Sequence, residues 1–125
     1  MSSPNHNQFV WCDIPVVNLD RAIKFYSTLI GHPVTKEVMP GMTFGLFPHA
    51  QDSVSGCLTE MADNKPGATG PLIYLNCDGR LDIAIAMVEL NGGKILKPKH
   101  QIGPYGFRAV IQDSEGNHIA LHSSK

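Results

Sequence analysis

The sequence predicts an α+β fold in which two βαβββ modules pair around one core, each with a curved sheet that forms a half-barrel. The first observation is an internal repeat: Leu, Asp, Ala, Ile and Gly recur at a constant offset of 62 residues in segments 19–31 and 81–93. The second is that short apolar runs precede and follow both segments, as strands would. Two copies are too few for a solenoid. We therefore expect two strand–helix–strand modules in one domain of 125 residues.

The first module is expected to span residues 7–61. Residues 9–16 are rich in aromatic and β-branched side chains, which favours a strand. Asn18 is a good N-cap, and apolar residues from Leu19 to Ile30 then follow the spacing of one helix face. Gly31 is expected to end this helix. Further strands are expected at 34–38 and 42–47, joined by the turn Pro40-Gly41, and near 54–60.

The second module is expected at 71–123, after a linker at about 62–70 that is rich in turn-forming residues. Its helix should run from about Leu81 to Asn91, with Gly92-Gly93 at its end. Its strands are expected at 72–77, at 94–96 with an interruption at Pro98, and at 107–112 and 118–122 as a final hairpin.

Composition argues against several classes of partner. The formal net charge is −1 and no basic run is present, so we expect no nucleic-acid partner. No apolar stretch is long enough to cross a bilayer, and the polar residues 1–6 lack a signal-peptide core. The three cysteines are far apart and lack zinc or redox spacing, so we interpret them as buried free thiols in a reducing cytoplasm.

Three runs of sequence carry a resemblance to a known family. Residues 14–26, 92–96 and 113–121 resemble the first strand and helix, the middle segment and the last hairpin of the vicinal oxygen chelate superfamily, the glyoxalase, bleomycin-resistance and dioxygenase group. The likeness extends from about Phe9 to His122. It implies the glyoxalase/bleomycin resistance/dioxygenase fold, a small-molecule ligand, a bacterial-type protein and a homodimer formed side by side or by exchange of modules.

The resemblance also implies where a metal would bind. Metal enzymes of that group take a His, Gln or Glu ligand from each of four strands. The corresponding positions here are Trp11, Leu58, Leu72 and Ala120. A shift of one residue at Leu58 would bring in Cys57 or Thr59 without restoring four ligands. Since a divalent cation needs oxygen, imidazole or thiolate donors, we expect no metal and no other cofactor.

Strand alternation predicts which side chains share the cavity face. An aromatic floor with a few convergent polar groups suits a small organic ligand. Tyr105, in a turn-rich loop, is expected to cover the cavity and contact the ligand, although a plain turn with packed aromatic residues explains it equally well. The other residues predicted to face the cavity are Trp11, Asp13, Tyr74, Asn76, His118 and His122.

Asp13 and His118 are the predicted catalytic residues. Asp13 lies within an apolar strand, which favours either a general base or ligand anchor, or a structural salt bridge or hydrogen bond to a neighbouring loop. His118 and His122 have the spacing of one strand face and suit a proton shuttle, or a substituted metal site with Glu60 or Asp13 as a third donor. Alternatively, His118 belongs to the hairpin turn and His122 frays at the C-terminus.

These observations favour metal-independent binding of a small, partly aromatic or apolar molecule, by analogy with the bleomycin-resistance branch, which sequesters a drug. The second hypothesis is an enzyme: a glyoxalase-like lyase or isomerase with relocated metal ligands, or a metal-free acid–base catalyst that uses Asp13 and a histidine. The third is a structural or regulatory dimer whose core is filled. The fold alone does not decide among them, because one fold carries many activities.

Overall fold

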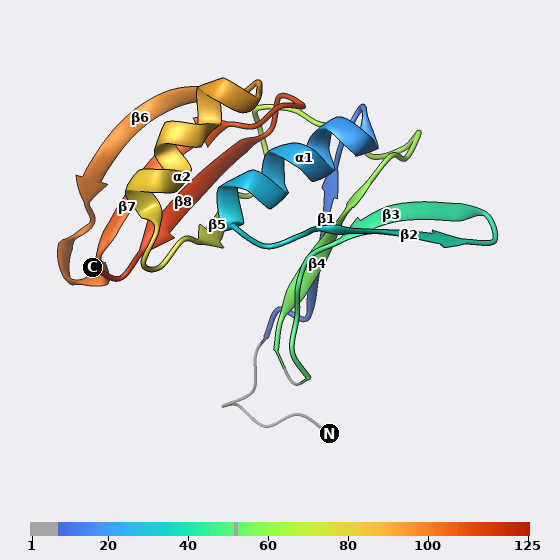
Figure 1. Cartoon of the computed structure of the whole chain (residues 1–125), viewed down its shortest axis with the longest axis horizontal. Helices are drawn as coiled ribbons and strands as arrows, with labels where there is room; N and C mark the ends of the chain where they lie inside the picture. The colour runs from blue at the N-terminus through green and yellow to red at the C-terminus, as the bar shows by residue number, and fades with distance from the viewer. Residues whose placement is uncertain (1–7, 52) are drawn as a thin grey trace.

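The computed structural model describes residues 8–51 and 53–125, so the predicted start of the first module at residue 7 lies outside the described residues. Two helices and two four-stranded sheets make up this part of the chain (Figure 1). The first module contains β1 (Trp11–Pro15), α1 (Leu19–Ile30), β2 (Thr35–Met39), β3 (Met42–Leu46) and β4 (Ser55–Thr59). The second contains β5 (Ile73–Asn76), α2 (Leu81–Val88), β6 (Lys94–Gln101), β7 (Phe107–Gln112) and β8 (His118–Ser123).

The two sheets have the same topology. Their strand orders are β1-β4-β3-β2 and β5-β8-β7-β6. In each sheet the first strand pairs in parallel with the last strand of its module, and the remaining pairs are antiparallel. Each sheet keeps two free edges and does not close into a barrel. The predicted α+β fold of paired βαβββ modules is therefore confirmed, as two open, curved sheets.

Helix α1 begins and ends where its sequence predicts. The side chain of Asn18 accepts a hydrogen bond of 3.0 Å from the backbone N–H of Arg21, which caps the first turn. Gly31 adopts a left-handed conformation with φ of 74°, and its N–H donates to the carbonyl of Ser27. No described helix is long and apolar enough to cross a membrane.

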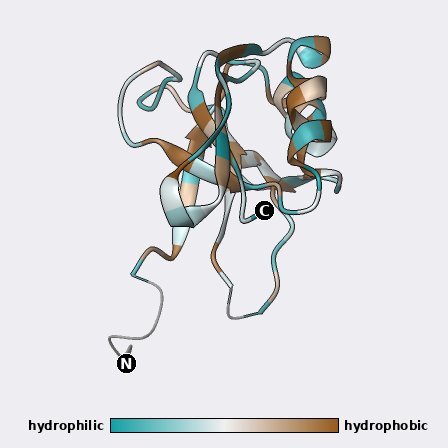
Figure 2. Cartoon of the chain, turned by 90° about the vertical axis from the view of Figure 1, so that its left-hand side faces the viewer, coloured by the Kyte–Doolittle hydropathy of each residue, from teal (hydrophilic) through white to brown (hydrophobic). Residues whose placement is uncertain are grey.

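One hydrophobic core joins the modules. The two helices lie side by side, and each packs on its own sheet (Figure 1). Phe25 and Tyr26 of α1 are fully buried together with Val88 of α2, Leu58 of β4 and Leu121 of β8. In Figure 2 the helix ribbons alternate between brown and teal, as expected of helices that bury only one face.

The second module departs from prediction at β6. The strand continues through Pro98 to Gln101, so the predicted interruption is wrong. Because β6 is an edge strand, a residue without an N–H can be accommodated there. Register shifts between Ile95 and Lys97, and between Lys97 and His100, absorb the irregularity. The helix is also shorter than predicted, since the last residues, Glu89–Asn91, form a 3-10 turn.

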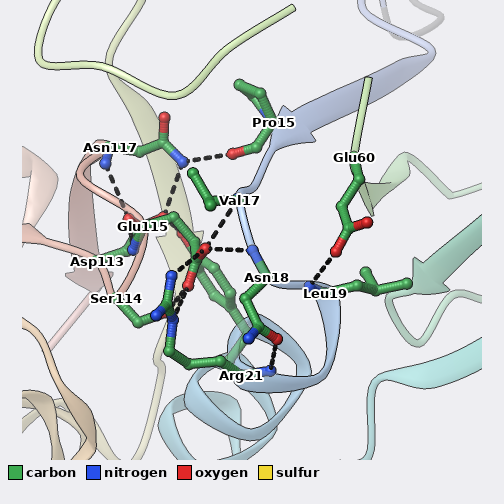
Figure 3. Close-up of polar contacts among 11 residues, drawn as sticks. Pro15, Val17, Asn18, Leu19, Arg21, Glu60, Asp113, Ser114, Glu115 and Asn117 are labelled. Carbon is green, nitrogen blue, oxygen red and sulfur yellow. Dashed lines mark hydrogen bonds and ion pairs between the residues drawn. The ribbon is translucent and has the colours of Figure 1, made fainter. Parts of the chain in front are cut away.

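Glu115, in the turn between β7 and β8, ties the second module to the start of α1 (Figure 3). Its carboxylate accepts hydrogen bonds of 2.8 Å from the N–H groups of Val17 and Asn18, and forms an ion pair of 2.7 Å with Arg21. Burial alone raises the pKa of Glu115, but the bonds from Arg21, Asn18, Ser114 and Val17 outweigh it and lower the pKa to about 2. The turn is thus a charged clamp across the module boundary.

Two neighbouring contacts reinforce this boundary. Tyr26 donates its hydroxyl hydrogen to the buried carboxylate of Asp113, and burial followed by the nearby negative charge raises the pKa of Tyr26 well above its ordinary value. Asn117 donates to the carbonyl of Pro15 at 2.8 Å (Figure 3). A third contact lies at the other end of α1, where Arg80 of the second module donates to the carbonyl of Leu29 at 3.1 Å.

Candidate functional site

The open face of each sheet, which points away from the helices, carries the candidate site residues. In the first sheet Ile14 and Leu58 point to the core, so Trp11, Asp13 and Cys57 point the other way. Asp13 accepts hydrogen bonds from Trp11 Nε1 at 3.1 Å and from Cys57 Sγ at 3.3 Å. Burial, with the Asp13 carboxylate adding to it, raises the pKa of the Cys57 thiol to about 11, so this thiol is protonated near neutral pH.

The open face of the second sheet carries a more extended polar group. Arg108 of β7 donates from Nε to His100 Nε2 at 2.9 Å and from Nη1 to the hydroxyl oxygen of Tyr74. The ring of Tyr74 also packs edge-on against that of His122, with centroids 6.1 Å apart. His122 lies 2.7 Å from the backbone carbonyl of Tyr105, which only accepts, so Nε2 of His122 carries a hydrogen. We name these four side chains, Tyr74, His100, Arg108 and His122, the Arg108 cluster.

The predicted site residues of the second module lie in different surroundings. His118 is the first residue of β8, half-buried, and its ring has no hydrogen-bond partner among residues 8–51 and 53–125. His122 does not fray, because it lies within β8 and its carbonyl accepts from the N–H of Cys77. Asn76 accepts from the N–H of Asp78 at 2.9 Å, which stabilises the turn before α2. Tyr105 is 75% exposed, and its backbone carbonyl contacts His122 of β8.

The chain divides the predicted cavity residues into two groups. Trp11 and Asp13 lie on the first sheet, whereas Tyr74, His118 and His122 lie on the second. No hydrogen bond, ion pair or ring contact within the described part of the chain joins the two groups. Asp13 is exposed and forms no salt bridge with any described residue, so the predicted structural ion pair is not seen and its contacts stay within its own sheet.

Of the Arg108 cluster, Arg108 itself lines a pocket of about 430 Å³ between the second sheet and residues 68–72. Arg108, Lys97 and His118 line it together with the apolar side chains of Leu72 and Leu96. Sequence analysis missed Arg108. The available signal was its position in the otherwise apolar run Phe107–Ile111, where alternation places it on the same face as His118 and His122.

Comparison with known proteins now bears on this architecture. Residues 8–121 match the model of the Glyoxalase/Bleomycin resistance protein/Dioxygenase superfamily. The chain belongs to this superfamily. The predicted family is therefore confirmed over nearly the whole length of the chain. Among functionally curated protein sequences, none matches.

Solved structures agree with this assignment at the level of fold. The chain is similar to a glyoxalase/bleomycin resistance protein from Albidiferax ferrireducens, with 19% identity, a TM-score of 0.68 and coverage of 94% of this chain and 99% of the other. It is also similar to a family enzyme from Burkholderia phytofirmans, with 12% identity, a TM-score of 0.69 and coverage of 92% and 97%. A glyoxalase I mutant from Zea mays gives 21% identity, a TM-score of 0.70 and coverage of 92% and 45%.

The residues present do not fit the superfamily's four-ligand metal site. Leu58, one of the four expected positions, is fully buried in the core. The neighbouring residue Cys57 lies on the open face instead, where it contacts Asp13. Trp11, Leu72 and Ala120 offer no donor atom of the kind a divalent cation needs. Glu60 is directed toward the start of α1, where one oxygen of its carboxylate accepts from the N–H of Leu19 at 2.6 Å (Figure 3). Within the described residues, no three His, Cys, Asp or Glu side chains gather as a metal site would require.

Proposed function

We propose that this superfamily member binds a small organic molecule, partly aromatic or apolar, on the open faces of its sheets and without a metal. The observation that carries the proposal is the replacement of metal donors on these faces by aromatic and apolar side chains. Trp11 stands at one of the four metal-ligand positions, with Asp13 beside it, and Tyr74 lies close to two others, Leu72 and Ala120. Aromatic rings beside a few oriented polar groups suit recognition of a small molecule.

The unsatisfied groups of the open faces support the proposal. Trp11 is 44% exposed and Tyr74 47% exposed, which is unusual for large aromatic residues set in strands. The hydroxyl of Thr59, which alternation places on the same face as Cys57, is buried without a hydrogen-bond partner among the described residues. A ligand or a second chain that covered the two aromatic rings would remove apolar surface from water.

The proposal includes a homodimer that acts in the cytoplasm. Each sheet has two free edges, and neither sheet closes on itself. Val38, Met39 and Met42 expose further apolar surface on the β2–β3 hairpin. Free edges and exposed apolar side chains both favour association with another chain. A second copy could also bring the first-sheet group of one chain near the second-sheet group of the other, which a single chain keeps apart.

A metal-free enzyme is the second candidate, and one observation favours it. His118 is half-buried at the pocket and its ring has no partner among the described residues, so it is free to exchange a proton with a bound molecule. Asp13 lies on the other sheet and would act with His118 only across two chains. Turnover of a bound molecule that His118→Gln abolishes while binding persists would establish this candidate. Unchanged turnover would exclude His118 as the catalytic residue.

The binding proposal is tested with the only tryptophan as reporter. Small aromatic molecules are titrated while Trp11 emission is followed, and a ligand on the first sheet should quench it or shift it to shorter wavelength. Asp13→Asn keeps the shape but removes the charge, and should weaken a cationic or donor-bearing ligand by about 1.5–3 kcal/mol. Because Asp13 is exposed, the melting temperature of the Asp13→Asn variant should differ little from that of the wild type. If no candidate molecule changes the intensity or wavelength of Trp11 emission, and native mass spectra show no bound molecule, the proposal fails.

A further inference from the structure

On the open faces, Arg108 is the residue whose surroundings indicate the charge of a binding partner. Its guanidinium is half-buried on β7, and both of its hydrogen-bond partners, His100 and Tyr74, are acceptors without a negative charge. The tautomer of His100 follows from its own contacts. Its Nδ1 lies 2.9 Å from the carbonyl of Pro98, which only accepts, so Nδ1 carries the hydrogen and Nε2 accepts from Arg108.

No acidic side chain neutralises this charge within the chain as described. The ion pairs of the described residues join Arg21 to Glu115, Lys36 to Asp20 and Lys99 to Asp82. Arg108 takes part in none of them. Lys97, which faces Val110 across β6 and β7, takes part in none either and lines the same pocket. No Asp or Glu lines that pocket, so it is positively charged.

The contacts of Arg108 also orient its remaining donors. Its Nε and one hydrogen of Nη1 are used by His100 and Tyr74. Its Nη2 has no partner among the described residues. Nη2, with both of its hydrogens, and the second hydrogen of Nη1 therefore remain able to donate to the oxygens of an anion.

We infer that this pocket binds the carboxylate or phosphate group of the small-molecule ligand, with Arg108 as its anchor and Lys97 as a second positive charge. The inference rests on the proposed function and names the chemical class of its ligand: an anionic group on a small apolar or aromatic body. The body would contact Leu72 and Leu96, which form the apolar part of the pocket. The volume of about 430 Å³ suits a molecule of this kind.

The probes are benzoate and inorganic phosphate, with benzamide as the neutral analogue of benzoate. Binding is measured by calorimetry and by the NMR resonance of the Arg108 Nε–H group, assigned through its loss in Arg108→Gln. Benzoate, phosphate or both should shift this resonance saturably, whereas benzamide should bind at least tenfold more weakly than benzoate, since a hydrogen bond to a charged group contributes about 1.5–3 kcal/mol. Preference for benzoate or for phosphate then identifies the anion as a carboxylate or a phosphoryl group.

The variants distinguish the effect of charge at the pocket on anion binding from the effect of the net charge of the protein. Arg108→Gln should weaken the preferred anion about tenfold or more. Lys97→Gln should weaken it roughly threefold, as expected of an exposed charge. Lys24→Gln, which removes an equal charge from an exposed position on α1, should leave binding unchanged. Arg108→Lys keeps the charge without the forked geometry and should give an intermediate loss, so the inference remains testable if Arg108→Gln does not fold.

Three results would overturn the inference: no shift of the Arg108 resonance by either anion, equal affinity for benzamide and benzoate, or undiminished anion binding by both Arg108 variants. Binding of benzamide or of another neutral molecule alone refutes the anion site and leaves the proposed function standing. Failure of all three probes, together with no organic molecule in native mass spectra, contradicts the proposed function as well.

Discussion

Glu115 shows how a single buried charge holds two modules together. Its carboxylate is surrounded by donors from the first module, and its side chain is fully shielded from solvent. Replacing it by the uncharged Gln removes the ion pair with Arg21, although the amide oxygen can still accept from the N–H groups at the start of α1. Because the Arg21 side chain is half-exposed, water screens part of this ion pair, and its loss costs less than the loss of a fully buried pair. The β7–β8 turn is therefore a determinant of stability and not part of the ligand site.

The first prediction concerns the pH dependence of this clamp. The pKa of Glu115 is lowered from an ordinary 4.5 to about 2, so its stabilisation is present above pH 4.5 and is lost as the pH falls toward 2. Urea unfolding should show the free energy of unfolding falling by about 3 kcal/mol over this range from this group alone. Glu115→Gln should be less stable at pH 7 and should lack this part of the decline. The control is Glu89→Gln, which changes an exposed carboxylate and should keep the wild-type pH dependence. If the free energy of unfolding of Glu115→Gln also falls with pH as in the wild type, Glu115 does not stabilise the protein in this way.

At single residues, alternation predicts which side chains of one strand share a face. The predicted site residues Trp11, Asp13, Tyr74, His118 and His122 all lie in strands, but on two separate sheets. Sequence analysis placed Leu58 on the open face because the repeat was assumed to hold to the residue, whereas Leu58 lies in the core and Cys57 faces Asp13. The pairing of Arg108 with His100 and Tyr74 depends on three separate strands, which no local pattern specifies.

At the scale of elements, the two helix ends show how the repeat diverges. Gly31 is the left-handed residue that ends α1. Its repeat partner is Gly93, but in the second module Gly92, with φ of 94°, takes the left-handed conformation. Gly93 is instead required by close packing. A Cβ there would lie 2.6 Å from the carbonyl oxygen of Gln112 and 2.8 Å from side-chain atoms of Phe25 and Val88.

The second prediction follows from this packing. Gly93→Ala should destabilise the protein by about 2 kcal/mol, the usual range for an overpacked core, because neither the β7 backbone nor Phe25 can move freely. Gly67→Ala is the matched control, since a Cβ at Gly67 meets nothing within 4 Å. Chemical denaturation compares the two. Equal stability of both variants would show that the contact between the end of α2 and β7 is looser than the structure indicates.

The elements themselves were predictable because their signals are local. The cap at Asn18, the glycines after both helices and the last hairpin at Asp113–Asn117 all occur where sequence predicts them. The continuation of β6 through Pro98 was not predictable from the strand alone. It depends on β6 lying at a sheet edge, and edge position is a property of the whole sheet.

At the scale of the whole molecule, the open sheets bear on association. The third prediction is that the chain is a homodimer in dilute solution, because each sheet leaves edges and apolar side chains uncovered. Sedimentation at micromolar concentration should give twice the chain mass of 13.6 kDa. A monomer under these conditions would contradict the prediction, and the two groups of open-face residues would then act separately.

The central claim, that the open faces bind an organic ligand without a metal, is tested most directly by native mass spectrometry with elemental analysis on protein purified without chelators. We expect no stoichiometric zinc, nickel, iron or manganese, and ligand binding that EDTA does not change, because Trp11, Cys57, Leu72 and Ala120 do not make a four-ligand site. One tightly bound divalent ion per chain, with EDTA-sensitive activity on a hemithioacetal, would contradict it.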